Sequence, residues 1–362
     1  MSLSLTDDAL LEPVQLVAPD GTARAVDGYD ARRLDGRLAD LYQAMVVTRE
    51  LDEEFVNLQR QGELALFPPC RGQEAAQVGC VSALRDDDWL FPQYRELGAF
   101  VVRGIDPGGI GLMWRGTWHG GLGLVERAVA PMSIPIGTHA LHAVGAAMAS
   151  TRLGDGGVTV AFVGDGATSE GDVHEALNLA AVEAAPCLFY VQNNGWAISV
   201  PLTDQFRAPS IAHKGIGYGI PAVRVDGNDV VACLLVVEAA AQRAREGGGP
   251  TLIEAVTYRL GPHTTSDDPS RYRDADEVEA WEALDPIARC AGYMRRRGVW
   301  EDAVETAARE RAADLRTRLR AAVVDAADPP AAEVFDHVFT EPTAELDAQR
   351  AVLLAELAQE EG

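Results

Sequence analysis

The chain has 362 residues, 47% of them hydrophobic, which is enough for one large domain or two modest domains with a buried core. Its net charge of −24 gives a surface that repels phosphate backbones, so we expect neither nucleic acid nor an anionic membrane as a partner. We find no apolar stretch long enough to cross a bilayer, no basic start of a secretory signal and no Cys-x-x-Cys pair. These absences favour a cytoplasmic protein with free thiols.

Several common catalytic motifs are missing. The chain has a single lysine, Lys214, and it stands in no phosphate-binding loop, which argues against phosphate-loop and pyridoxal phosphate chemistry. His174-Glu175 is similar to the start of a zinc-binding helix, but Asn178 occupies the position of the second ligand. Gly-x-Gly-x-x-Gly and Gly-x-Ser-x-Gly are also absent, so nicotinamide-binding and serine-hydrolase interpretations lose their usual support.

The order of predicted elements indicates an α/β protein. A loose N-terminal arm, 1–29, precedes a long helix over 30–61, and small apolar residues predict buried helices over 72–84 and 138–150. Continuous apolar runs predict strands at 158–163, 187–191, 222–225 and 251–258. A helix that ends at about 184 lies between the first two strands, and a helix over 229–246 lies between the last two. We expect a mostly parallel sheet flanked by helices in an α/β domain, 30–276, which ends in a mobile loop over 264–276. A helical C-terminal region, 277–362, follows.

The most informative segment starts at Gly164-Asp165-Gly166 and ends at Asn193-Asn194. Each of these two groups directly follows a predicted strand, so both lie at the carboxyl edge of a parallel sheet, where such sheets bind ligands. Glycines allow a diphosphate to approach the backbone, while Asp165, Asn194 and the carbonyl of Trp196 offer oxygens to Mg²⁺. Either group alone is more typical of a simple turn, but together they predict a metal-bridged diphosphate site.

The sequence around these residues resembles a known family. Gly-Asp-Gly-Ala-Thr-Ser-Glu-Gly-Asp at 164–172 and Gln-Asn-Asn-Gly-Trp-Ala-Ile-Ser at 192–199 are similar to the thiamine diphosphate motif of one group of enzymes. These are the alpha subunits of the decarboxylating component of 2-oxo acid dehydrogenase complexes. The likeness continues through Phe-Pro-Gln-Tyr-Arg-Glu at 91–96, Val-Asp-Gly-Asn-Asp at 225–229 and Gly-Pro-His-Thr-Thr-Ser-Asp-Asp at 261–268. It extends over about residues 30–340, and it implies a thiamine diphosphate-binding α/β fold.

The resemblance implies roles for individual positions. The residues expected to bind the cofactor are Gln93, Tyr94, Arg95, Ile136, Gly164, Asp165, Gly166, Ala167, Asn194, Trp196 and His263. Three of these, Asp165, Asn194 and Trp196, are the expected Mg²⁺ ligands. The expected catalytic residues are His263, beside the reactive carbon of the cofactor, together with His119, Tyr272 and Arg273. Without the family context, Ile136 would be an ordinary core residue, and Tyr272 and Arg273 would be solvated.

Two positions depart from the pattern of branched-chain enzymes. His139 replaces a glutamine associated with a potassium site, which puts that ion in doubt. Gln192 replaces an arginine, which puts one phosphate contact in doubt. In addition, Thr264 replaces a serine that is phosphorylated in mammalian relatives, so kinase control through that position is not implied.

The implied activity is oxidative decarboxylation of a small 2-oxo acid followed by reductive acylation of a lipoyl group. The resemblance also implies a beta subunit in an α2β2 heterotetramer and a lipoyl-bearing transacylase core. The motifs slightly favour branched-chain 2-oxo acids, while pyruvate and acetoin dehydrogenase subunits stay open as alternatives. A catalytically silent subunit with the same fold and a plain sugar-diphosphate-binding protein are alternatives from other classes.

Overall fold

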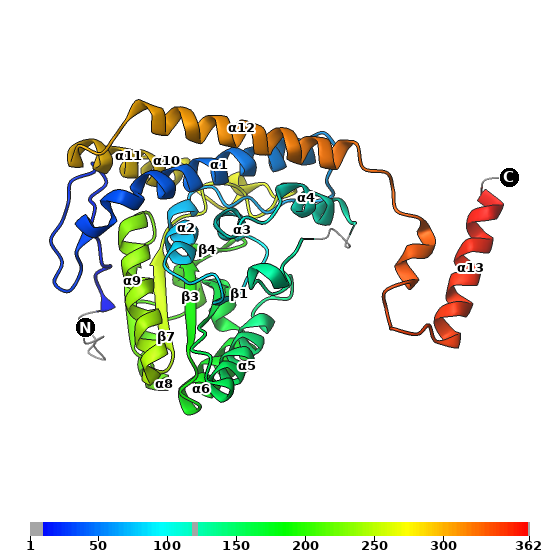
Figure 1. Ribbon diagram of the computed structural model, residues 1–362, viewed down its shortest axis with the longest axis horizontal. Helices are drawn as coiled ribbons and strands as arrows, with labels where there is room; N and C mark the ends of the chain where they lie inside the picture. The colour runs from blue at the N-terminus through cyan, green and yellow to red at the C-terminus, as the bar shows by residue number, and fades with distance from the viewer. Residues whose placement is uncertain (1–9, 118–121, 361–362) are drawn as a thin grey trace.

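A parallel sheet of five strands in the order β1-β2-β3-β7-β6 forms the centre of the computed structural model, which describes residues 10–117 and 122–360 (Figure 1). Its strands are β1 (Trp89–Phe91), β2 (Thr159–Gly164), β3 (Cys187–Asn193), β6 (Ala222–Asp226) and β7 (Thr251–Val256). A separate antiparallel hairpin consists of β4 (Trp196–Ala197) and β5 (Val200–Pro201). Gly164 pairs with Gln192, and Asn193 pairs with Val256, so β2, β3 and β7 end at the same edge of the sheet.

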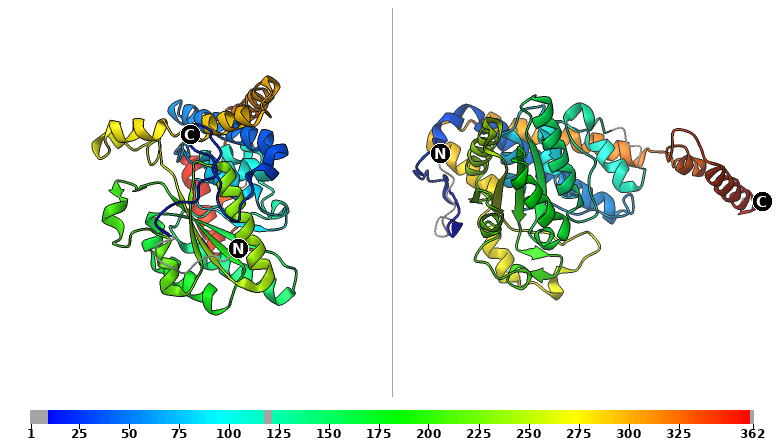
Figure 2. Two further views of the ribbon diagram at one scale, coloured as in Figure 1. Left: turned by 90° about the vertical axis from the view of Figure 1, so that its left-hand side faces the viewer. Right: turned by 90° about the horizontal axis from the view of Figure 1, so that it is seen from below.

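Helices surround this sheet on both faces (Figures 1 and 2). The α-helices are α1 (Leu38–Arg60), α2 (Glu74–Ser82), α3 (Leu97–Arg103), α4 (Pro107–Arg115), α5 (Thr138–Leu153), α6 (Gly171–Val182), α7 (Leu202–Gln205), α8 (His213–Tyr218), α9 (Val230–Arg243), α10 (Ala275–Glu282), α11 (Pro286–Arg297), α12 (Asp302–Val324) and α13 (Ala344–Glu360). The 3₁₀ helices are η2 (Ala31–Arg37), η3 (Val125–Arg127), η4 (Gly166–Ser169), η6 (Pro269–Arg271) and η7 (Ala331–Phe335), and η5 (Ala244–Gly248) is a π turn.

The alternation of side chains along each strand creates two separate cores. In β2, Val160 and Phe162 pack into the cluster that contains the buried residues of α1, α2 and α9. Ala161 and Val163 point to the other face, into the cluster formed with α5 and α6. Because both faces of the strand are covered, its sequence is a continuous apolar run rather than an alternating one.

The predicted α/β architecture is confirmed. The four predicted strands form β2, β3, β6 and β7, with ends that differ by at most two residues from those expected. The helix expected over 30–61 is the 3₁₀ helix η2 followed by α1, and the helix expected over 229–246 is α9 followed by the π turn η5. The edge strand β1 was not predicted, because three residues are too few to show a period.

The expectation of a loose N-terminal arm is wrong for its described part. Leu16 and Val17 are fully buried, and their backbone N–H groups donate to the carboxylate of Asp229. The backbone N–H of Val14 donates to the carbonyl of Arg224, so the arm extends the sheet beside β6. Backbone pairing with a strand far away in the sequence leaves no local pattern, and the sequence alone therefore did not reveal it.

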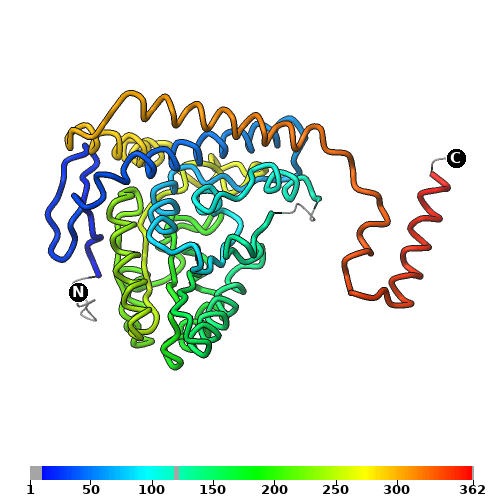
Figure 3. The backbone as a smooth tube through the Cα atoms, in the orientation of Figure 1, coloured from blue at the N-terminus to red at the C-terminus, as the bar shows by residue number. Residues whose placement is uncertain are grey.

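The C-terminal helices fall into two groups. Helix α12 runs along α1 (Figure 3), and the buried carboxylate of Glu54 on α1 pairs with Arg316 and Arg320 of α12. Beyond α12 the chain leaves the body, and α13 stands apart from the sheet in Figures 1 and 3 and in the right-hand view of Figure 2. A domain boundary at 276 remains a prediction. Among the described residues, no helix combines the length and apolarity needed to span a membrane.

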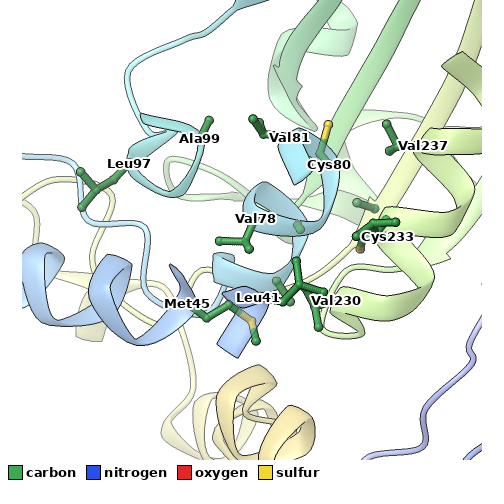
Figure 4. Packing of buried hydrophobic residues seen from close by; sticks show 14 of the residues in the cluster. Leu41, Met45, Val78, Cys80, Val81, Leu97, Ala99, Val230, Cys233 and Val237 are labelled. Atoms are coloured by element: carbon green, nitrogen blue, oxygen red, sulfur yellow. The ribbon is translucent and has the colours of Figure 1, made fainter. Parts of the chain in front are cut away.

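Helix α2 lies directly between α1 and α9. Met45 of α1, Val78 of α2 and Val230 of α9 pack together in this layer (Figure 4). Gly79 marks the closest approach: a Cβ atom at this position would lie 2.6 Å from the Cβ of Cys233 and 2.9 Å from the carbonyl oxygen of Val230. Such distances require the helices to separate.

We therefore expect Gly79→Ala to lower the free energy of unfolding by about 1–3 kcal/mol, the usual cost of overpacking. Urea unfolding followed by circular dichroism measures this change. Gly145→Ala on the exposed face of α5 is the matched control, because the added Cβ would meet no described atom within 4 Å beyond the backbone of its own helix. This control is expected to raise stability by about 0.5–1 kcal/mol through helix propensity. Equal effects of the two substitutions would contradict the packing argument.

Candidate active site

A pocket of about 230 Å³ opens at the carboxyl edge of the sheet. Every residue predicted to bind the cofactor lines this pocket: Gln93, Tyr94, Arg95, Ile136, Gly164, Asp165, Gly166, Ala167, Asn194, Trp196 and His263. Glu170, Ala197, Ile198 and Arg259 complete the lining. These residues come from five separate parts of the sequence, and the parallel arrangement of β2, β3 and β7 brings them together.

Asp165 and Asn194 occupy the ends of two neighbouring strands. Both are almost inaccessible, with 1% and 7% of their surface exposed. Burial raises the pKa of the Asp165 carboxyl above its ordinary value, although a hydrogen bond from Gln205 opposes this shift. The Nε2 atom of Gln205 donates to Asp165 Oδ2 at 2.8 Å. A buried carboxylate is costly without a compensating charge, so the position favours a bound cation.

A tight turn follows Asp165. The chain forms the 3₁₀ helix η4 there, and the longer helix α6 begins only at Gly171. A Cβ atom at Gly166 would lie 2.6 Å from the Cβ of Ala197 in the neighbouring hairpin. The glycine is therefore required by the close approach of β4 as well as by any ligand. The helix predicted to end at about 184 is thus α6, and a separate 3₁₀ turn precedes it.

Two arginines beside His263 give the pocket a positive side. The Nη2 atom of Arg95 lies 3.2 Å from Nδ1 of His263 and donates to the His263 carbonyl at 3.0 Å. Nη1 of Arg259 lies 3.5 Å from the same Nδ1. Burial, followed by the charges of Arg95 and Arg259, lowers the pKa of His263 to about 4. The imidazole is therefore neutral at physiological pH, and its Nδ1 faces two guanidinium donors, which places the proton on Nε2.

Arg259 lines the pocket but was not predicted from the sequence to be a site residue. It is 1% exposed, it donates from Nη2 to the carbonyl of Ile198 at 2.7 Å, and burial lowers its pKa to about 10. Ile198 has a φ of 56°, a strained conformation for a β-branched residue, and the bond from Arg259 holds its carbonyl in place. An arginine directly after a buried strand was the available signal, since a buried charge of this kind needs a dedicated set of partners.

Tyr272 and Arg273 do not line the pocket. Tyr272 receives a hydrogen bond from Arg259 Nη2 at 3.0 Å and donates to Asp267, while Arg273 donates to the carbonyls of Arg259 and Leu260. Asp267 in turn accepts from the backbone N–H of His263 at 2.9 Å. These hydrogen bonds hold the loop that carries His263 in place. The remaining expected catalytic residue, His119, lies outside the described residues.

Gln192 lies behind the pocket. Its Nε2 atom donates to the carboxylate of Glu96 at 2.6 Å, and its Oε1 atom accepts from Gln77 at 3.0 Å. Glu96 is fully buried, which raises its pKa to about 7, and it also accepts from Gln93 Nε2 at 3.1 Å. Gln192 therefore helps to orient Gln93, a residue that lines the pocket. His139, the other position that departs from the pattern of branched-chain enzymes, is buried, and its Nε2 atom faces the carbonyl of Phe162.

The fold and this pocket agree with one family of enzymes. The model of the dehydrogenase E1 component family matches residues 42–334, which is most of the chain. The chain therefore belongs to the dehydrogenase E1 component family.

Individual relatives of known name are similar to this chain over most of its length. The alpha subunit of 3-methyl-2-oxobutanoate dehydrogenase from Mycobacterium tuberculosis is 63% identical over 96% of this chain and 95% of its own length. The pyruvate dehydrogenase E1 alpha subunit of Acholeplasma laidlawii is 38% identical over 86% of this chain and 91% of its own length. The corresponding subunit of Staphylococcus aureus is 39% identical over 80% of this chain and 78% of its own length.

The electrostatics of the pocket can be tested directly. We expect Arg95→Gln to raise the pKa of His263, because the substitution removes a positive charge that disfavours the imidazolium form. Titration of ¹³C-labelled histidines by NMR in the absence of ligands should give a value of about 4 for the unmodified protein and a higher one for the variant. Arg271→Gln, at an exposed position on the same loop, is the control. An unchanged His263 pKa in Arg95→Gln would show that Arg95 does not set it.

Proposed function

We propose that this chain is the alpha subunit of a thiamine diphosphate-dependent 2-oxo acid dehydrogenase that acts on branched-chain 2-oxo acids such as 3-methyl-2-oxobutanoate. The observation that carries this proposal is the convergence, in one pocket, of every residue position that the family motif assigns to the cofactor. The substrate class rests on the relatives: the sequence identity is 63% to a 3-methyl-2-oxobutanoate enzyme and 38–39% to pyruvate enzymes.

The residues present fit Mg²⁺ bound through a diphosphate. Asp165, Asn194 and the carbonyl of Trp196 are hard oxygen donors, as Mg²⁺ prefers, and a diphosphate shared with the ion would complete the set. Gln205 supports this fit, since its Oε1 atom is buried and has no hydrogen-bond partner within the described chain. The described residues contain no cluster of three or more His, Cys, Asp or Glu suited to a metal, so a site here depends on one carboxylate and the cofactor.

The same pocket fits the anionic end of the cofactor. Arg95 provides a guanidinium for phosphate oxygens, and Arg259 adds a second positive charge. The Nε atom of Arg259 and the indole Nε1 of Trp196 are buried donors that lack partners among the described residues. Unsatisfied buried donors around a positively charged pocket favour an anionic ligand.

Bound thiamine diphosphate supplies the electron sink that decarboxylation of a 2-oxo acid requires. In this chain His263 is the group suited to proton transfer, because its neutral ring carries the proton on Nε2. Arg95 orients that ring through Nδ1, and the Tyr272–Asp267 pair holds the backbone of His263. Ile136, which is 41% exposed, gives the pocket an apolar wall against which the cofactor can be held in shape.

A beta subunit would complete this site. The pocket of about 230 Å³ is smaller than the roughly 300–1,000 Å³ of typical ligand sites and it is open, as expected if a second chain forms the remaining wall. The relatives are named as alpha subunits, which supports such a partner. We propose an α2β2 heterotetramer that passes its acyl group to the lipoyl groups of a transacylase core.

Pyruvate is the second candidate substrate, because two of the relatives are pyruvate dehydrogenase subunits. We expect the co-expressed alpha and beta chains, supplied with Mg²⁺ and thiamine diphosphate, to release CO₂ from 3-methyl-2-oxobutanoate with a higher kcat/KM than from pyruvate. A preference for pyruvate would reassign the substrate. Release from neither acid would favour an acetoin dehydrogenase or a catalytically silent subunit, and cofactor binding separates these two.

The metal assignment has its own test. We expect Asp165→Asn to lose Mg²⁺-dependent binding of thiamine diphosphate, because the substitution removes the one carboxylate of the proposed ligand set while keeping its shape. Isothermal titration calorimetry with and without Mg²⁺ measures the loss. Asp204→Asn, at an exposed position on α7, should bind normally. Unchanged affinity in Asp165→Asn would refute the assignment.

A further inference from the structure

Lys214 is the only lysine in the chain, and it contacts the turn that carries the Gly-Asp-Gly segment. It lies at the start of α8, and its Nζ atom donates to the carbonyl of Thr168 at 2.5 Å and to Thr168 Oγ1 at 2.9 Å. Its aliphatic stem is half-buried, and Nζ lies 5.5 Å from the centre of the Phe206 ring. Lys214 does not line the pocket, so any effect on a ligand must pass through Thr168.

Thr168 transmits the contact to Asp165. The Thr168 side chain is 2% exposed, and its Oγ1 donates to the carbonyl of Asp165 at 2.7 Å while its backbone N–H donates to the same carbonyl at 3.1 Å. The ammonium of Lys214 therefore sits at the carboxyl end of the short helix η4, where a positive charge is favourable. Without it, the carbonyl and hydroxyl oxygens of Thr168 would lose a charged donor in a buried position.

The other side of α8 is tied to the neighbouring strand. The fully buried carboxylate of Glu254 on β7 accepts from the backbone N–H of Ala212 at 2.9 Å, two residues before Lys214. The same carboxylate accepts from Asn193 Nδ2 at 2.7 Å, next to Asn194. One frame, from Glu254 through α8 and Lys214 to Thr168, thus connects the strand end that carries Asn194 with the one that carries Asp165.

From this frame we infer that Lys214 is a positioning residue, which acts through Thr168 to fix Asp165 relative to Asn194 for binding of a divalent cation. The inference rests on the proposed function of this pocket. It predicts a particular kinetic signature: loss of the lysine should weaken Mg²⁺ binding while leaving kcat near normal once Mg²⁺ is saturating, because Lys214 touches neither the ligand nor His263.

The test uses the α2β2 enzyme with Lys214→Met, Lys214→Arg and the control Arg207→Met, which removes a cation from an exposed position on the same segment. Binding of thiamine diphosphate is titrated against Mg²⁺ by calorimetry, without substrate. We expect Lys214→Met to raise the apparent Kd for Mg²⁺ about tenfold, as loss of a charge-assisted hydrogen bond implies. Lys214→Arg should restore binding to within about threefold, since a guanidinium is also a charged donor. Arg207→Met should have no effect.

Two results would overturn the inference: wild-type Mg²⁺ affinity in Lys214→Met, or an equal loss in Lys214→Met and Arg207→Met. If Lys214→Met does not fold, Thr168→Val is combined with Lys214→Arg, and non-additive changes in Mg²⁺ affinity are expected because the two residues act in one chain of contacts. Additive changes would refute the coupling. Failure of the unmodified enzyme to bind thiamine diphosphate would instead refute the proposed function, so the two hypotheses fail separately.

Discussion

The parallel pairing of β2 with β3 is the constraint on which the site depends. Because Gly164 lies opposite Gln192, the residues just beyond each strand, Asp165 and Asn194, emerge at the same level of the sheet. A shift of one residue in either strand would turn its side chains to the opposite face and exchange the two cores. The pairing is therefore held in place by packing on both faces, and the same packing fixes the spacing of the polar groups that follow.

Electrostatics then distinguish this edge from the rest of the molecule. The chain carries a net charge of −24, but the pocket contains Arg95 and Arg259 beside a histidine that stays neutral. Two buried guanidinium groups so close together repel each other, and each is held by backbone carbonyls: Pro69 for Arg95, and Trp196 and Ile198 for Arg259. Such an arrangement costs stability in the absence of an anion and is stabilised when an anion binds, which agrees with the proposed binding of a diphosphate.

Support for the site comes from groups that lie behind it. Glu96 orients Gln93, Asp267 and Tyr272 hold the loop of His263, and Glu254 anchors the segment that leads to Lys214. Glu96, Asp267 and Tyr272 act on residues nearby in the sequence, whereas Glu254 contacts Ala212, 42 positions away. A pocket built in this way positions its functional atoms through buried hydrogen bonds, which lock side chains more firmly than exposed contacts do.

The sequence by itself determined the α/β class, the four main strands and the strand-end residues Asp165 and Asn194, because long apolar runs and glycine-rich segments after strands are local signals. The family resemblance indicated the other predicted positions of the pocket, such as Arg95, Ile136 and His263. Only the tertiary structure decided the rest. It placed Arg259 in the pocket, turned Gln192 toward Glu96, moved Tyr272 and Arg273 behind the lining and tied Leu16 and Val17 to Asp229. These outcomes depend on pairs of residues far apart in the chain, whose partners are chosen by the need to satisfy buried polar groups after folding.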